Sequence, residues 1–155
     1  MTGRIAARLK ELKLELPKAP APVANYAPWV KTGSLLFVSG QITMGPNGLE
    51  FAGTVGRDVS VEDAKRAARL AALNVVAQAA VALDGDLDRV KRVVKVTGWV
   101  NSANGFAQQP DVINGASDLF VEIFGDGGRH ARAAVGASSL PRNTSVEIEA
   151  IFEIM

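Results

Sequence analysis

The last stretch of the chain constrains its fold most strongly, because its side chains alternate in character from Val146 to Ile154. The apolar positions are Val146, Ile148, Ala150, Phe152 and Ile154, and between them lie Glu147, Glu149 and Glu153. Successive side chains of a strand point to opposite faces, so this alternation is typical of an antiparallel strand with one buried face. The chain is therefore expected to form a sheet that buries one of its faces.

A second strand is predicted just before it, in the run from His130 to Ala137. Its two faces carry Ala133, Val135 and Ala137 on one side, and Arg132 with Ala134, Gly136 and Ser138 on the other. Small neighbours leave space around the guanidinium of Arg132, which favours a pocket beside it. A turn rich in Ser, Pro and Asn, residues 138–143, joins the two strands.

Two helices with apolar stripes are predicted between the strands. One runs from Ser60 to Leu83, with Ser60 as its cap and Asp63 at the capping-box position. Its buried side consists of Ala64, Ala68, Ala71, Val75 and Ala79. The other runs from Asp111 to Phe124 after Pro110, with a stripe of Val112, Ala116, Leu119 and Ile123.

Three further runs read as strands. Trp29 to Lys31 and Leu35 to Gln41 flank a turn at residues 32–34 and predict a hairpin. Because Leu35 to Val38 is apolar throughout, both of its faces are expected to be covered. Arg89 to Asn101 is expected to place Val94, Val96 and Val100 on one face and Lys95, Thr97 and Trp99 on the other.

The order of elements predicts an α+β fold, a mixed sheet with two helices on one face. The other face is expected to carry Glu147, Glu149, Arg132, Lys95 and Trp99. That set is too mixed for the core of a monomer, so we expect several sheets to assemble around a shared axis.

Residues 1–24 are expected to be an appendage to a single domain spanning residues 25–155. The pattern predicts a short amphipathic helix over residues 2–16, capped by Thr2 and stopped by Pro17, followed by a proline-rich connector. The helix is expected to pack on the domain or on a neighbouring subunit; the alternative is a helix on a membrane surface.

Composition narrows the function classes. Seventeen basic and sixteen acidic residues give a net charge of +1, which offers no field to hold a nucleic acid. The chain has no cysteine and one histidine, so thiolate chemistry is absent and there is little material for His-based metal sites or triads. No apolar run is long enough to span a membrane. A cytoplasmic protein without cofactor, nucleic-acid partner or membrane partner is expected.

Several motifs resemble the reactive intermediate deaminase family, also called the RidA, YjgF or endoribonuclease L-PSP family. Arg132, then Leu140-Pro141, then residues 146–150 are similar to its closing signature, and residues 37–42, which include Gly40, resemble its second strand. Asn114 is similar to an asparagine that opens the second helix in that family. The resemblance runs from about Tyr26 to the C-terminus.

The resemblance implies a homotrimer of chorismate-mutase-like subunits, with sheets inside, helices outside and pockets between neighbours. In the family, the arginine matching Arg132 grips the carboxylate of a 2-imino or 2-enamino acid. The acid matching Glu147 orients the water that hydrolyses this substrate to a 2-keto acid and ammonia. No cofactor is needed, because a protonated imine is already electrophilic.

The implied substrate-binding set is Arg132, Trp29, Gly40, Asn114 and Ala134, and the catalytic pair is Arg132 and Glu147. Two positions depart from the best-known enzymes, which have a cysteine where Ala134 stands and a tyrosine where Trp29 stands. These departures favour a related but distinct subgroup.

Simpler interpretations stay open at each position. Arg132 and Glu147 can be solvated or ion-paired side chains, Asn114 a helix cap, and His130 a surface or capping residue and not a catalytic one. At the level of function, the alternatives are a non-catalytic trimer that binds small carboxylates or ketoacids and, less favoured, an endoribonuclease. The low net charge and single histidine speak against a ribonuclease.

Overall fold

The computed structural model describes residues 3–22 and 24–155, and its centre is a five-stranded sheet in the order β1-β2-β7-β5-β6. The strands are β1 (Trp29–Thr32), β2 (Leu35–Ile42), β5 (Val90–Asn101), β6 (Ala131–Ala137) and β7 (Val146–Ile154). Neighbouring strands are antiparallel except β5 and β6, which are parallel. The predicted mixed sheet is therefore confirmed.

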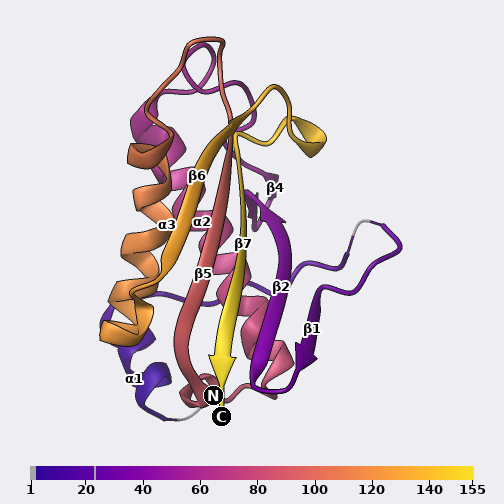
Figure 1. Cartoon of the computed structure of the whole chain (residues 1–155). Coiled ribbons are helices and arrows are strands. Elements are labelled where there is room, and N and C mark those ends of the chain that lie inside the picture. The colour runs from indigo at the N-terminus through magenta and orange to yellow at the C-terminus, as the bar shows by residue number, and fades with distance from the viewer. Residues whose placement is uncertain (1–2, 23) are drawn as a thin grey trace.

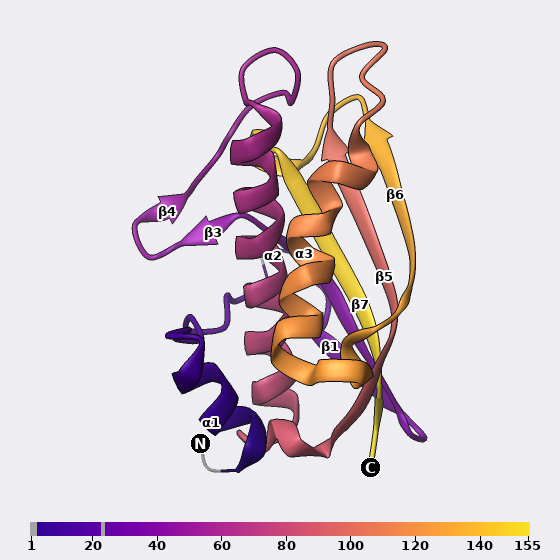
Figure 2. The same ribbon diagram turned by 90° about the vertical axis from the view of Figure 1, so that its left-hand side faces the viewer.

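Two long helices cover one face of this sheet, as Figures 1 and 2 show from two sides. They are α2 (Val61–Ala82) and α3 (Gln109–Phe124). Shorter elements are α1 (Arg4–Glu11), β3 (Met44–Gly45), β4 (Gly48–Leu49) and the 3-10 turns η1 (Leu87–Arg89), η2 (Gly125–Gly128) and η3 (Pro141–Asn143). We call the side under α2 and α3 the helix face and the other side the open face.

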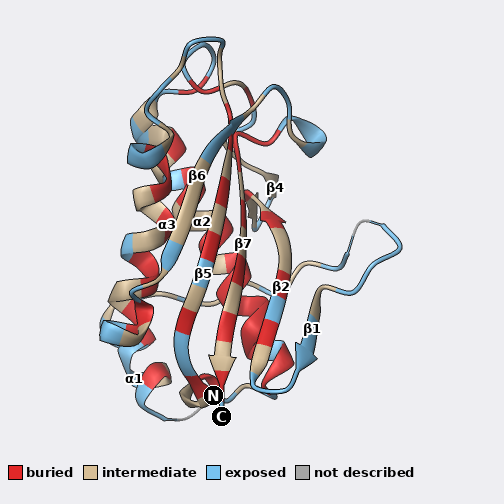
Figure 3. Ribbon diagram, in the orientation of Figure 1, coloured by how far each residue is buried: buried red, intermediate tan, exposed pale blue. Residues whose placement is uncertain are grey.

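The central strand β7 alternates as predicted. Its five apolar side chains, Val146, Ile148, Ala150, Phe152 and Ile154, are buried, and the residues between them are half-buried (Figure 3). Burial of each large apolar side chain contributes about 1.5–3 kcal/mol. Because β7 lies between β2 and β5, this strand joins the two halves of the sheet and supplies the middle of the core.

The helices pack closely because their contact residues are small. The Ser60 hydroxyl accepts a hydrogen bond from the Asp63 amide at 3.1 Å, as predicted for the α2 cap. The predicted alanine side of α2 and the predicted stripe of α3 are all buried. Where the two helices touch, a Cβ at Gly115 would lie 2.0 Å from the Lys65 carbonyl oxygen, so a larger residue would force them apart.

Three predictions about single positions are wrong. Asn114 does not open α3, which begins at Gln109, so Asn114 lies in the second turn and cannot cap the helix. Val94 does not share the buried face, because a register shift between Val93 and Lys95 puts Val93 there instead. Phe37 is 40% exposed on the open face, so only one face of the apolar run in β2 is covered in the chain.

Arg132 lies on the helix face, not on the open face where it was expected beside Glu147. In the sheet register Arg132 is paired with Val96, which is fully buried under the helices. Glu147 is paired with Trp99, on the opposite face. Paired residues share a face, so the two charged side chains point to opposite sides of the sheet.

The N-terminal helix is shorter than predicted and is anchored by a residue far along the chain. It ends at Glu11, and Lys13 takes a left-handed conformation with φ 54°; the expected Thr2 cap lies outside the described residues. The Asp88 carboxylate accepts hydrogen bonds from the amides of Arg4 and Ile5, both at 2.7 Å. Ile5 and Leu9 then reach the hydrophobic core.

None of the helices in the described ranges, 3–22 and 24–155, is long and apolar enough to cross a membrane.

We predict that Asp88→Ala lowers the free energy of unfolding by about 0.5–2 kcal/mol, the usual cost of losing a helix cap. The two amide bonds hold the pKa of Asp88 below its usual value, and desolvation only partly opposes them. The stabilisation is therefore present at neutral pH and is lost as pH falls through the pKa of the folded state. Urea unfolding of both proteins at pH 7 and in acid measures this; an equal difference at both pH values would contradict it.

Candidate functional site

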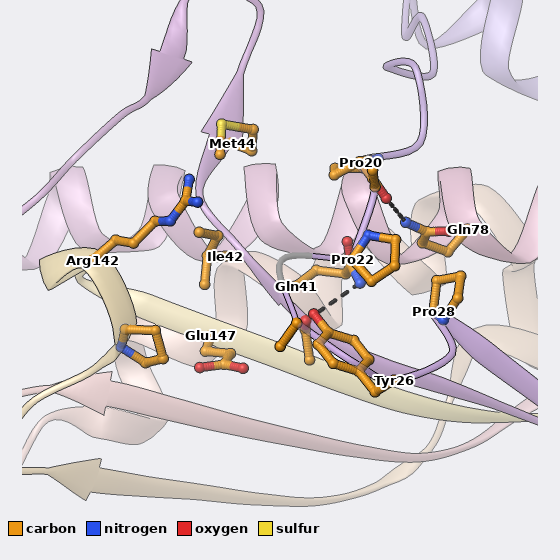
Figure 4. A pocket seen from close by; sticks show the side chains of 14 residues that line it. Pro20, Pro22, Tyr26, Pro28, Gln41, Ile42, Met44, Gln78, Arg142 and Glu147 are labelled. Atoms are coloured by element: carbon orange, nitrogen blue, oxygen red, sulfur yellow. Dashed lines mark hydrogen bonds between the residues drawn. The ribbon is translucent and has the colours of Figure 1, made fainter.

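A pocket of about 480 Å³ opens beside Glu147 on the open side of β7 (Figure 4). The N-terminal connector forms much of its wall, and residues of β2, β3, α2 and the turn before β7 supply the rest. The lining residues are Pro20, Ala21, Pro22, Ala24, Tyr26, Pro28, Gly40, Gln41, Ile42, Met44, Gln78, Pro141, Arg142 and Glu147. The wall is mainly apolar, and Glu147 and Arg142 are the charged side chains in it.

The connector is fastened to the body of the protein near both of its ends. The Gln78 side chain of α2 donates to the Pro20 carbonyl oxygen at 2.6 Å. The Ser39 hydroxyl of β2 donates to the Ala27 carbonyl oxygen at 2.7 Å. These bonds place Tyr26 over the pocket, and they give residues before the matched motifs a part in building its wall.

A bulge in β2 brings the backbone against the Glu147 carboxylate. The register of β2 against β7 shifts between Val38 and Gln41, which leaves Ser39 and Gly40 outside the regular ladder. A Cβ at Gly40 would lie 2.2 Å from the Glu147 Oε1 atom. Gly40 is therefore a residue where the carboxylate needs the space that a side chain would take.

The Glu147 carboxylate is half-buried and has no hydrogen-bond or ion-pair partner within residues 3–22 and 24–155. Burial raises its pKa above the usual glutamate range, and the negative charge of Glu149 on the same face raises it further. An unpaired carboxylate with a raised pKa, facing a pocket, can accept a proton from a bound water.

Arg132 belongs to a second cluster, at the edge of the sheet where β6 meets α3. Its Nη1 donates to the Ser117 hydroxyl and its Nη2 donates to the Pro110 carbonyl oxygen, each at 3.2 Å. Asn114 lies between Pro110 and Ser117 on the same stripe of α3, at positions i, i+4 and i+7. Ala134 follows on the same face of β6 and packs against the core.

Trp29 does not line the pocket. Trp29 lies in β1 and is paired with Val38 of β2, so its indole packs against the core on the helix face. Tyr26 lines the pocket instead and was missed by the sequence analysis, although it is the only tyrosine in the chain. Its position in a connector without periodicity gave no pattern that could point to it.

One chain does not bring Arg132 and Glu147 together. Residue 135 of β6, and not residue 132, shares the row of Glu147, and β5 lies between their strands. Two strand spacings alone separate them by roughly 10 Å, and their side chains point to opposite faces. A small ligand held by Arg132 of one chain therefore cannot touch Glu147 of the same chain.

Within the described residues, no group of three His, Asp or Glu side chains gathers closely enough to hold a metal ion. The pocket and the Arg132 cluster thus offer one carboxylate, guanidinium groups, a hydroxyl and backbone carbonyls.

Comparison with known proteins gives one consistent family. The model of the family described as "YjgF/chorismate mutase-like, putative endoribonuclease" matches residues 6–154. The protein TCP17 of Trypanosoma cruzi is 47% identical over 99% of this chain and 96% of its own length. The 2-iminobutanoate/2-iminopropanoate deaminase of Salmonella typhimurium is 33% identical over 86% of this chain and 90% of its own. The crystal structure of Atu1372 from Agrobacterium tumefaciens, 52% identical, covers 97% of this chain and 92% of its own with a TM-score of 0.91.

We predict that the carboxyl carbon of Glu147 titrates above the usual glutamate range in a ¹³C NMR experiment. Glu149→Gln should move the pKa of Glu147 down, but not back to the usual value, because burial is the larger cause. Both measurements use protein that also carries Arg132→Ala, so that the positive charge of an Arg132 guanidinium from another chain cannot lower the pKa of Glu147. A Glu147 pKa at or below the ordinary glutamate value would contradict the proton-acceptor chemistry inferred from the geometry.

Proposed function

Because this chain belongs to the YjgF/chorismate mutase-like family, we propose that it hydrolyses small 2-imino and 2-enamino acids to 2-keto acids and ammonia without a cofactor. The observation that carries the proposal is the half-buried carboxylate of Glu147, which has no partner among the described residues and faces a mainly apolar pocket. The deaminase name of the relative from Salmonella typhimurium supports the same chemistry.

Arg132 is the proposed anchor for the substrate carboxylate. A guanidinium has five N–H groups, and within the described part of the chain Arg132 uses two of them, toward Ser117 and Pro110. The others are free to form two parallel hydrogen bonds to a carboxylate, a geometry that lysine cannot reproduce. Ala134 and Asn114 lie on the same side of the β6 edge and would contact the substrate next to its carboxylate.

Glu147 is the proposed base. It takes a proton from water while the water oxygen bonds to C2 of the protonated imine. Glu147 then returns this proton to the nitrogen. The C–N bond breaks with its electron pair leaving on ammonia, and Glu147 takes the proton of the C2 hydroxyl, so that the C2–O bond becomes a carbonyl. A well-placed base contributes about 10²–10⁴-fold in rate. The raised pKa of Glu147 makes its carboxylate a stronger proton acceptor than that of an ordinary exposed glutamate.

The site requires two chains, because Arg132 and Glu147 of one chain point to opposite faces. We propose a homotrimer in which Arg132 at the β6 edge of one subunit reaches the Glu147 pocket of its neighbour. The open face supports this assembly, since it exposes large apolar side chains: Val30 at 53%, Phe37 at 40% and Val135 at 42%. A face of this kind is covered in stable oligomers.

We predict a particle of three times 16.3 kDa in light scattering at micromolar concentration. Phe37→Glu should dissociate it, because the new charge would be buried without a partner. Val81→Glu is the matched control: Val81 on α2 is 55% exposed but lies away from the open face. Wild-type protein that scatters only as a monomer, or a trimer unaffected by Phe37→Glu, would contradict the assembly.

The activity test uses a dehydratase that forms 2-iminopropanoate or 2-iminobutanoate in the assay and follows the appearance of the ketoacid. Arg132→Ala should weaken binding of substrate and ketoacid at least about tenfold, since charge-assisted hydrogen bonds contribute roughly 1.5–3 kcal/mol each. Arg132→Lys should recover only part of this. Glu147→Gln should lower kcat by about 10²–10⁴-fold and still bind pyruvate.

Glu153→Gln is the control, because Glu153 lies on the same strand but pairs with Lys91 and Arg92 at the far end.

A trimer that only binds ketoacids is the second candidate, and the alanine at position 134 favours it, since that position holds no polar group. Wild-type protein that binds pyruvate through Arg132 without accelerating hydrolysis would establish the binder. Arg132→Ala protein that equals wild type in rate and binding would remove the role of Arg132.

A further inference from the structure

The single histidine of the chain is joined to Arg132 through one hydroxyl group. His130 lies directly before β6, and Ser117 lies on α3 across from it. The Ser117 Oγ is 2.9 Å from His130 Nε2 and 3.2 Å from Arg132 Nη1. The other ring nitrogen, Nδ1, is 2.6 Å from the Gly128 carbonyl oxygen.

The hydrogen-bond acceptors in this series of contacts determine which ring nitrogen of His130 carries a proton and in which direction the Ser117 hydroxyl donates. A carbonyl oxygen only accepts, so Nδ1 of His130 must carry hydrogen and donate to Gly128. In the neutral ring Nε2 is then an acceptor, and the Ser117 hydroxyl donates to it. The Ser117 oxygen keeps lone pairs for Arg132, whose guanidinium can only donate. Every hydrogen bond therefore runs in one direction, from Arg132 to Ser117 to His130.

The surroundings of the ring hold it in this state. The edge of His130 meets Phe120 of α3 with the two centroids 5.7 Å apart, and η2 provides the Gly128 carbonyl. Arg132 of β6 is the charged group that acts on the ring. Burial lowers the pKa of His130, and the Arg132 charge lowers it further, while the Gly128 bond opposes both. At neutral pH and above, the ring is neutral and can accept from Ser117.

We propose that His130 and Ser117 are positioning residues that hold the Arg132 guanidinium ready for the substrate carboxylate. Both residues act through Arg132, because Ser117 contacts the guanidinium and His130 contacts Ser117. Together with the Pro110 carbonyl, Ser117 fixes the plane of the guanidinium. Ordering the side chain before binding removes an entropy cost from the complex. The inference rests on the proposed role of Arg132 as carboxylate anchor.

The first test is NMR of the ring of His130, whose signals are unambiguous because the chain has one histidine. Long-range ¹H–¹⁵N correlations at pH 8 should show the Nδ1–H tautomer. Saturating pyruvate should shift the Nε2 signal in wild-type protein and leave it unchanged in Arg132→Ala. An Nε2–H tautomer, or an Nε2 signal unmoved by pyruvate that binds through Arg132, would overturn the proposal.

The second test compares variants that keep or remove the link. Ser117→Ala should raise the Kd for pyruvate about three- to tenfold, as expected for one lost hydrogen bond, and should raise KM more than it lowers kcat. Ser117→Thr keeps a hydroxyl and should stay near wild type. His130→Phe keeps the aromatic contact with Phe120 but removes the acceptor, and should resemble Ser117→Ala. His130→Gln places an amide oxygen near the Nε2 position and should recover part of the loss.

The two proposals can fail separately. If wild-type protein binds no ketoacid and hydrolyses no imine, the proposed function is wrong, but the order of the Arg132 side chain still tests the inference. Its ¹⁵N–¹H guanidinium signals, assigned by their loss in Arg132→Ala, should be resolved in wild type and averaged in Ser117→Ala. Ser117→Ala and His130→Phe proteins that match wild type in these signals, or in affinity where wild type binds, would overturn the role of the two residues.

Discussion

The alternation of apolar and charged side chains along β7 decides which face of the sheet the helices cover and which face stays open in the single chain. Its apolar side chains are buried under α2 and α3, and Glu147 and Glu149 point to the other side. Because β7 lies between β2 and β5, the same alternation sets the register on both sides. The core and the candidate base therefore come from one strand, and neither can change face without the other.

The elements that depend on local periodicity were predictable from the sequence. The α2 cap at Ser60, the alanine side of α2 and the stripe of α3 are found where the pattern placed them. The hairpin of β1 and β2 is found too. In each case burial and sequence spacing report the same physical fact, namely that one face of a helix or strand is apolar.

The face of Arg132 was not predictable in this way. Alanine stands on both sides of it in β6, at positions 131 and 133, so the strand has no strong contrast between its faces. Its orientation comes from the parallel register against β5, which pairs Arg132 with buried Val96. Long-range contacts explain the other surprises as well: Asp88 caps α1 across 84 positions, and the connector with Tyr26 joins the pocket through Gln78 and Ser39.

The opposite orientation of Arg132 and Glu147 makes sense if each subunit offers one half of a site. The Arg132 guanidinium lies at the β6 edge, held by Ser117 and Pro110, and the Glu147 carboxylate faces a pocket without a partner among residues 3–22 and 24–155. Separating unlike charges in this way keeps each from neutralising the other within the chain. If the site is formed in this way, imine hydrolysis requires the assembled oligomer.

Subunit mixing tests this division most directly. Arg132→Ala and Glu147→Gln proteins, each impaired alone when assayed below the wild-type KM, are unfolded together in equal amounts and refolded as mixed oligomers. If each site takes Arg132 from one chain and Glu147 from another, random mixing restores about a quarter of the sites. We predict that recovery of imine hydrolysis. Mixed oligomers whose activity does not exceed the mean of the two parents would contradict a site shared between chains.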